Sequence, residues 1–299
     1  MMNFISTYQS VLDHILVYSL LAMSQYIVLR AGTFSMGSAA FASISAYATA
    51  ILVTRAGWPA PVAIASGVVL ATLASAVMAF PLSRLRGVFQ AVATLALVQV
   101  VVTVNLNWED MTRGALGISG IPKVVTTGWL LAVVGAAVAV LHLLGRFGIG
   151  RAMDVIREDE TVAVSLGIRV AYHQSMAMIL SGVLAGLAGA LYACNSYAVG
   201  PEEFGFTMMV NALAMAVLGG RTSVWGALVG AAVLTILPEL FRVFAEYRNV
   251  VQGVLLMLVI IYLPNGIADT LLALAHDRRV KRSMSDAGSA GAGSVLKTP

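Results

Sequence analysis

The chain has 299 residues, of which 59% are hydrophobic and only 11% are charged. Because a soluble domain is about half apolar and about a quarter charged, this composition excludes an ordinary soluble protein and predicts a surface that mostly faces lipid. The net charge is +4, and the basic residues lie mainly in short loops, where they indicate membrane topology rather than nucleic-acid binding.

Nine apolar runs approach the length of about 20 residues that crosses a bilayer. They lie at 10–29, 33–54, 59–80, 88–106, 128–145, 174–194, 204–218, 225–241 and 249–264. The run at 204–218 is short enough to be a half-helix instead. We therefore expect an all-α, polytopic membrane protein with about nine transmembrane helices (eight to ten) over residues 1–274. Residues 275–299 are basic and then rich in Gly, Ala and Ser, which predicts a disordered tail.

The basic residues predict how these spans are oriented. When the loop at 145–173 is placed in the cytoplasm, 13 Lys and Arg residues fall inside and 5 fall outside, which accounts for all 18. Cytoplasmic loops carry the excess of basic residues. We therefore expect the N-terminus and the loop at 107–127 outside and the C-terminus in the cytoplasm, and the same bias favours a full crossing at 204–218.

Ionisable groups are sparse at membrane depth. The spans at 33–54, 59–80, 88–106, 174–194 and 249–264 contain no Asp, Glu, Lys, Arg or His. This disfavours a proton-coupled secondary transporter and an intramembrane hydrolase, both of which need such groups. The chain also lacks the Gly-x-x-x-x-Gly-Lys-[Ser/Thr] loop that cradles nucleotide phosphates. We predict no catalytic residue, no metal site and no cofactor bound by this chain, so ATP would be hydrolysed on another chain.

The loop at 145–173 contains the most informative segment, Arg151–Ile168. It predicts two short helices, with Asp159 capping the second and Gly167 in the left-handed conformation that ends it. Its apolar residues require a partner surface; they are Val155, Ile156, Val162 and Leu166. The segment either docks on an ATPase or lies on lipid headgroups. Its acidic residues weigh against anionic lipid, and a self-standing passive channel would have no use for a docking segment.

Motifs along the chain resemble one family. They are Gly32–Tyr47, Thr112–Pro122, Arg151–Ile168, Ser181–Tyr192, Val217–Gly226, Leu237–Leu240 and Pro264–Ile267. The third resembles R-A-x-R-A-I-R-E-D-E-x-A-A-x-x-L-G-I, the cytoplasmic loop of branched-chain amino-acid ABC importer permeases of the M type. Arg113 stands where that family has a glycine in T-G-G-x-x-G-L-S-G-I-P.

The resemblance implies an ABC importer permease fold in a bacterial inner membrane. The substrate would be a branched-chain amino acid or a related small polar metabolite such as an amide, urea or organic acid. The implied partners are an H-type permease subunit, two ATP-binding subunits that hold ATP and Mg, a periplasmic substrate-binding protein and membrane lipid. A self-standing passive channel or secondary transporter for a small solute is the alternative.

Candidate site residues follow from these motifs. For coupling to the ATPases we single out Arg157, Glu158, Asp159, Glu160, Leu166 and Gly167. Candidates for the substrate pathway are Ser35, Gly37, Phe41 and Tyr47, which could instead serve helix packing. Candidates for docking the binding protein are Arg113, Glu202 and Glu203, which could instead be solvated surface residues. Gly219 and Gly220 are candidates for a hinge or a tight turn.

Overall fold

The computed structural model describes residues 2–220, 223–240, 253 and 257. Almost all of this part is helical, apart from one short pair of strands. The long helices are α1 (Met2–Arg30), α2 (Ser38–Thr54), α3 (Ala60–Leu82), α4 (Val88–Asn107), α6 (Thr127–Arg146), α9 (Val170–Asn195), α10 (Phe206–Gly219) and α11 (Val224–Leu240). The short elements are α5 (Glu109–Thr112), η1 (Gly114–Leu116), β1 (Ile118–Ser119), α7 (Gly148–Glu158), α8 (Glu160–Ser165), β2 (Ala198–Val199) and η2 (Pro201–Phe204).

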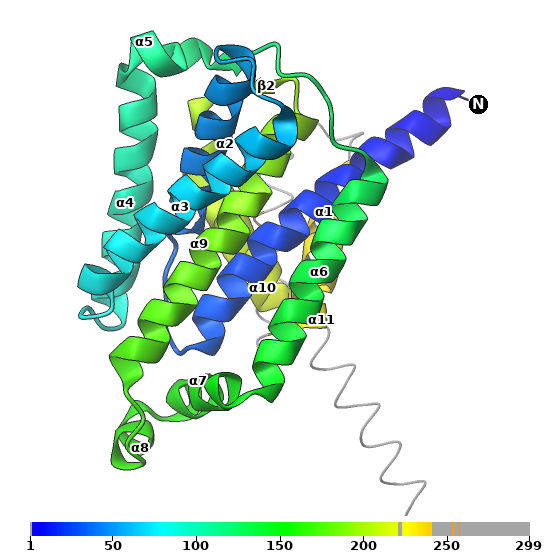
Figure 1. Cartoon of the computed structure of the whole chain (residues 1–299). Coiled ribbons are helices and arrows are strands. Elements are labelled where there is room, and N and C mark those ends of the chain that lie inside the picture. Colours follow the sequence, from blue (N-terminus) through cyan, green and yellow to red (C-terminus); the bar gives the residue numbers. More distant parts are fainter. Residues whose placement is uncertain (1, 221–222, 241–252, 254–256, 258–299) are drawn as a thin grey trace, which may run out of the picture.

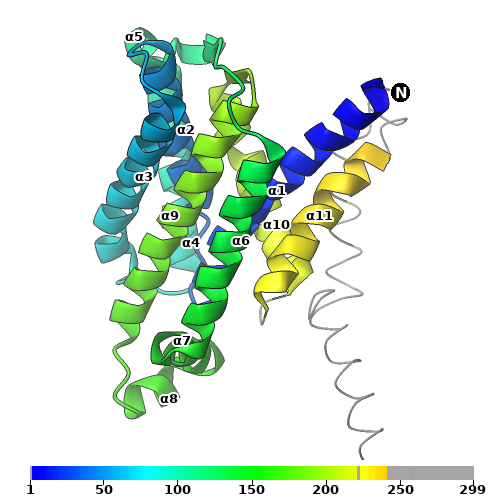
Figure 2. The same cartoon turned by 45° about the vertical axis from the view of Figure 1, so that its right-hand side comes forward.

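Helix α1 crosses the bundle obliquely and joins its two sides (Figure 1). On one side α1 packs against α6, α10 and α11, and on the other α9 packs against α1, α2 and α3. Figure 2 shows α11 beside α1, on the side away from α2 and α3, whereas α10 also contacts α2. Because helices from distant parts of the sequence cover it, α1 is largely buried, whereas α3, α4 and α6 are buried on a narrower face.

Small residues let these helices approach closely. A Cβ atom at Gly189 of α9 would lie 2.0 Å from the Ala42 carbonyl oxygen of α2, and one at Gly182 would lie 2.1 Å from Ser75 Oγ of α3. Helices pack in a membrane through such van der Waals contact, since lipid offers little hydrophobic driving force between them. The Gly, Ala and Ser residues that are abundant in the sequence therefore line the interfaces of α9 with α2 and α3.

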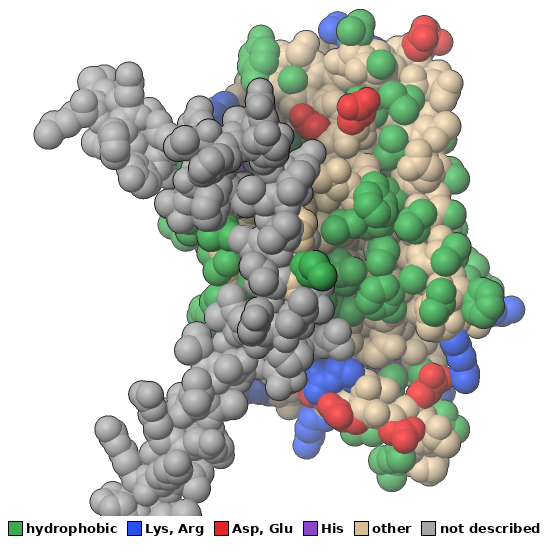
Figure 3. Space-filling model, turned by 180° about the vertical axis from the view of Figure 1, so that it is seen from behind, with side chains coloured by type: hydrophobic (Ala, Val, Ile, Leu, Met, Phe, Trp, Pro, Cys, Tyr) green, Lys and Arg blue, Asp and Glu red, His purple; other side chains and the backbone are tan. Residues whose placement is uncertain are grey.

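Among the described residues, five helices are long and apolar enough to cross a membrane: α1 from Gln9, α3, α4, α6 and α9. In Figure 3, apolar side chains gather across the middle of one face and charged side chains gather toward its two ends. This distribution suits a hydrocarbon layer between two aqueous faces. The all-α, polytopic prediction is confirmed, and the count of nine spans is not.

Several predicted boundaries need correction. The run at 33–54 becomes a helix only at Ser38, so the connection from α1 is longer than the three residues that the predicted ranges 10–29 and 33–54 leave between them. The run at 204–218 becomes α10, whose 14 residues extend about 21 Å, against about 30 Å for a hydrocarbon core. The run at 225–241 corresponds to α11, whereas the span predicted at 249–264 and the tail at 275–299 lie outside the described residues, except for residues 253 and 257.

The connection between α1 and α2, residues 31–37, is not helical, and it is mostly buried, with Gly32 and Phe34 exposed. Its backbone is satisfied by side chains: Gln25 Nε2 donates to the Ser35 carbonyl oxygen, and Thr94 Oγ1 accepts from Met36 N at 2.9 Å. Non-helical backbone is tolerated at membrane depth where protein surrounds it in this way. The hydrogen bonds that delay the start of α2 come from α1 and α4, which local sequence patterns do not reveal.

The loops gather at two opposite ends of the bundle. At one end lie α5, β1 and β2, and at the other lie α7 and α8 (Figure 1). Strands β1 and β2 are antiparallel, with Ile118 opposite Val199. The loops at 107–127 and 145–173 therefore lie at opposite ends, as the orientation prediction requires.

Candidate coupling hairpin and pathway residues

Helices α7 and α8 form a hairpin, which we call the α7–α8 hairpin. The residue between them, Asp159, caps the start of α8. Asp159 Oδ1 accepts hydrogen bonds from Thr161 N at 2.7 Å and Val162 N at 3.2 Å, so its carboxylate caps α8. These backbone donors hold the pKa of Asp159 below its usual value. The predicted cap is confirmed, so the Asp159 carboxylate stabilises the first turn of α8.

The end of α8 is equally well defined. Gly167 has φ +78°, its N–H donates to the Val164 carbonyl at 2.9 Å, and the Ile168 N–H donates to the Ala163 carbonyl at 3.0 Å. These two bonds form a Schellman motif, which ends a helix on a left-handed residue. The predicted helix end at Gly167 is confirmed, and a β-branched residue at this φ would be strained.

The apolar side chains of the hairpin divide into two groups. Ile156 is only 4% exposed and packs with Ala163 and Val170, with Val155 partly buried beside them. Our prediction that Ile156 and Val155 need an outside partner is therefore corrected, since this chain covers them. On α8, Val162, Val164 and Leu166 remain 48%, 58% and 66% exposed. Val162 and Leu166 are four residues apart and share one face, whereas Val164 lies on another. The surface open to a partner is consequently α8, and we call Val162 and Leu166 the α8 apolar patch.

The charged residues of the hairpin already interact within the chain. Arg157 and Glu158 form an ion pair at 2.9 Å, and Glu160 pairs with Arg86, which lies between α3 and α4, at 3.1 Å. A groove of about 560 Å³ runs along this side, lined by Asp154, Val155, Arg157, Glu158, Asp159 and Val162. The structure therefore gathers Arg157, Glu158 and Asp159 beside the α8 apolar patch.

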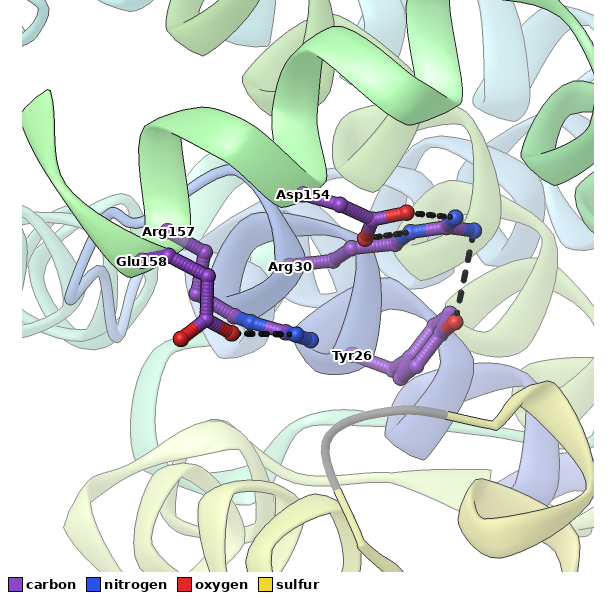
Figure 4. A network of polar contacts seen from close by, with 5 residues as sticks. All are labelled: Tyr26, Arg30, Asp154, Arg157 and Glu158. Atoms are coloured by element: carbon purple, nitrogen blue, oxygen red, sulfur yellow. Dashed lines mark hydrogen bonds and ion pairs between the residues drawn. The ribbon is translucent and has the colours of Figure 1, made fainter. Parts of the chain in front are cut away.

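A partly buried ion pair that the sequence did not predict joins the hairpin to α1 (Figure 4). Arg30 Nε donates to Asp154 Oδ1 at 2.8 Å and Arg30 Nη2 donates to Asp154 Oδ2 at 2.7 Å, which is a bidentate arrangement. Arg30 Nη1 also donates to the Tyr26 hydroxyl at 3.5 Å. Arg30 and Asp154 are separated by 124 residues, so no local pattern could have paired them.

Three of the four predicted pathway residues lie together where α2 begins. Ser35 Oγ accepts from Gly37 N at 3.3 Å, and a Cβ at Gly37 would contact the Phe41 ring at 3.4 Å. Tyr47 lies further along α2, where its ring packs against Phe204 at 6.4 Å between centroids. Ser35, Phe41 and Tyr47 are buried, and in the described part of the chain the Tyr47 hydroxyl has no hydrogen-bond partner.

The candidate docking charges lie at the end of the bundle opposite the α7–α8 hairpin. Glu202 and Glu203 are exposed on η2, which Phe204 anchors by packing edge-on against Tyr192 at 5.6 Å. Glu203 Oε2 accepts from Gly200 N at 3.4 Å. Arg113 has φ +61°, and it alone among the described non-glycine residues has a positive φ. The glycine that the family has there would adopt this conformation without strain.

Gly219 and Gly220 lie where α10 ends and the chain turns toward α11. Gly220 has φ +111°, a conformation that favours glycine. A Cβ at Gly219 would lie 1.9 Å from the Gly226 carbonyl oxygen, so the backbones of α10 and α11 touch there. Within residues 2–220 and 223–240, no three His, Cys, Asp or Glu side chains are grouped as a metal ion would need.

Residues 8–260 match the family described as branched-chain amino acid transport system / permease component. The chain belongs to this family. The match covers far more than half of the chain, and it confirms the resemblance that the motifs indicated. As a member of this family, the chain is a membrane-embedded transport subunit and not an enzyme.

Relatives of this permease component include two types of subunit. This chain is 30% identical over 287 residues to the high-affinity branched-chain amino acid transport system permease protein LivM of Escherichia coli K12. The match covers 84% of this chain and 68% of LivM. The chain is 34% identical over 120 residues to the LivH permease protein of the same organism, covering 40% and 39% of the two chains. The M-type assignment is supported because the LivM match extends over more of the chain.

A third relative of this permease component has a different cargo in its name. The autoinducer 2 import system permease protein LsrC of Klebsiella pneumoniae is 30% identical over 181 residues, covering 58% of this chain and 51% of LsrC. No solved structure matches the chain. The family is therefore established by sequence, while the substrate is not fixed by it.

Proposed function

We propose that this chain is the M-type permease subunit of an ATP-driven importer for branched-chain amino acids or a related small polar metabolite. The extent of the LivM match supports branched-chain amino acids ahead of other solutes. The name of LsrC shows that relatives serve another cargo, so a periplasmic binding protein would do most of the selection. The few ionisable groups at membrane depth suit a pathway without a tight binding site.

The observation that carries this proposal is the α8 apolar patch. Its two apolar side chains, Val162 and Leu166, stay exposed on one face of a short helix whose start and end are both fixed, while Ile156 is packed against the bundle. A preformed, exposed apolar helix is suited to a groove on a partner protein, in the way that helix-in-groove complexes form. A self-standing passive channel or secondary transporter would gain nothing from such a surface.

The proposed partners follow from this arrangement. Two ATP-binding subunits, carrying ATP and Mg, would dock on the α8 apolar patch of this chain and on its equivalent in an H-type permease subunit. The partial match to LivH supports two related permeases side by side, with the substrate pathway at their interface and Ser35, Gly37, Phe41 and Tyr47 near it. The α7–α8 hairpin would face the cytoplasm, and Arg113, Glu202 and Glu203 would face a periplasmic binding protein.

The test is a change in the α8 apolar patch of the reconstituted complex. Leu166→Asp places a carboxylate in the proposed groove, which costs several kcal/mol if it is unpaired. We expect the permease to insert normally but to retain far less ATPase on a pull-down and to lose uptake. Gly167→Val should act in the same direction, because it disrupts the end of α8.

Leu116→Asp is the matched control, since Leu116 is 90% exposed at the opposite end of the bundle. This variant should keep its ATPases. Normal uptake with bound ATPases in both Leu166→Asp and Gly167→Val would refute the docking assignment.

A further inference from the structure

The α7–α8 hairpin is joined to α1 by an ion pair between the buried Arg30 and the Asp154 side chain, which is 39% exposed, although α1 is not its neighbour along the chain. The Arg30 side chain is only 10% exposed, and it meets both oxygens of Asp154. Moving α7 away from α1 would leave the buried Arg30 charge without its partner, and this cost resists separation of the two elements. The contact therefore holds the end of α1 and the middle of α7 in one geometry.

Backbone packing reinforces this contact. Gly32, two residues beyond Arg30, has φ +72°, and a Cβ there would lie 3.3 Å from Arg157 Cα and from the Ile156 carbonyl oxygen. The turn that leaves α1 thus lies directly against the last turn of α7. A displacement of α7 would therefore act on the end of α1 through both a side-chain contact and a backbone contact.

Helix α1 continues this connection to the predicted pathway residues. Gln25 lies five residues before Arg30, about 7.5 Å along the helix axis. Its Nε2 donates to the Ser35 carbonyl oxygen, and its Oε1 accepts from Ser38 Oγ at 3.1 Å. Gln25 is buried and so holds both the non-helical segment and the first residue of α2.

We propose that α1 carries motion of the α7–α8 hairpin to the segment that contains Ser35, Gly37 and Phe41. Asp154, Arg30 and Gln25 are the positioning residues of this connection. The inference rests on the proposed function, because it takes α8 as the place where ATPases push. It assigns the moving element as α1, rather than α6 or α9, which flank the hairpin in sequence.

The experiment compares ion-pair variants of the whole reconstituted importer. Arg30→Gln and Asp154→Asn remove one charge each, and Arg30→Asp with Asp154→Arg exchanges the charges. The readouts are ATPase retention, ATP hydrolysis and substrate transported per ATP. We expect each single variant to keep its ATPases and hydrolysis but to lose about tenfold in substrate transported per ATP, which is within the range of coupling between two sites. The exchanged pair should recover most of that loss.

Two further variants address folding and specificity. Arg30→Lys keeps the charge but loses the bidentate geometry, so we expect a folded subunit with an intermediate loss of coupling. Arg86→Gln is the matched control, because Arg86 forms an exposed pair with Glu160 of the same hairpin. Exposed pairs contribute little, so this variant should couple normally.

The outcomes separate this inference from the proposed function. Normal transport per ATP in Arg30→Gln, Asp154→Asn and Arg30→Lys would overturn the role of α1, even if Leu166→Asp loses its ATPases. Detached ATPases in the Arg30 variants would also overturn it, because the pair would then shape the docking surface. Failure of the proposed function would instead show as ATPases retained by Leu166→Asp and Gly167→Val.

Discussion

Glu202 and Glu203 differ in how far the protein itself uses them. Glu203 accepts a hydrogen bond from the Gly200 backbone, whereas Glu202 points its charge to solvent from the same short helix. The anchor beneath both is Phe204, which is completely buried. Glu202 is therefore the cleaner probe of whether this end receives a binding protein.

We expect Glu202→Lys to weaken stimulation of the importer by its binding protein and to make the stimulation more sensitive to salt. Charges at the rim of an interface act mainly on the association rate, and salt screens them. The measurement is ATP hydrolysis against binding-protein concentration at low and high ionic strength. Glu202→Gln, which only removes the charge, should fall between the wild type and Glu202→Lys. Identical curves at low salt would leave Glu202 as a solvated surface residue.

Residue roles were predictable from sequence only where they depend on near neighbours. Asp159 and Gly167 could be assigned to the start and end of α8 because a cap is set by residues two to four positions away. Arg30 and Asp154 could not be paired, because their contact depends on how α1 and α7 pack. For the same reason, the sequence did not show that Ile156 is covered within the chain.

At the scale of elements, α10 and α11 depend on glycines that face each other. Cβ atoms at Gly219, Gly226 and Gly230 would lie 1.9, 2.4 and 1.9 Å from carbonyl oxygens of the opposite helix. Separations this short exclude any side chain larger than a hydrogen atom. The pair is therefore held at its closest possible distance, and α11 is positioned against α1 as part of that unit.

We expect Gly219→Ala to destabilise the subunit by about 1–3 kcal/mol, which is typical of overpacking. Gly135→Ala on α6 is the matched control, because a Cβ there would meet nothing within 4 Å. That substitution should be neutral or slightly stabilising, since alanine favours helix. Thermal unfolding in detergent, followed by tryptophan fluorescence, measures both variants. Equal midpoints would show that α10 and α11 can separate freely.

The positions of helices were more predictable than the faces that they bury. Hydropathy located most spans because a bilayer imposes a minimum length. On α4, however, three of the five buried residues are polar, namely Gln90, Thr94 and Asn105, while large apolar side chains such as Phe89 and Leu95 are exposed. When lipid covers the outer face, hydrophobicity no longer distinguishes inside from outside, so packing partners could not be predicted.

For the whole molecule, the orientation in the membrane is the property most open to a direct test. In a Cys194→Ala background, a cysteine at Ser119 should react with an impermeant thiol reagent added from outside, whereas one at Ser165 should not. Both positions are exposed and lie at opposite ends of the bundle, and Cys194 is itself buried. Labelling of intact cells against permeabilised cells provides the measurement, and the reverse pattern would overturn the predicted topology.

The burial of α1 also bears on how the protein is made. Among the described helices α1 comes first, yet much of its surface is covered by α9, α10 and α11, which are synthesised more than 100 residues later. Ser24, whose hydroxyl donates to the Ser181 carbonyl of α9 at 2.9 Å, has no such acceptor until then. At about 5–20 residues per second, translation leaves α1 without these partners for several seconds. During that interval the insertion machinery or a chaperone must cover polar groups of α1 such as the Ser24 hydroxyl. We therefore expect α9, α10 and α11 to pack against α1 at a late stage of membrane insertion.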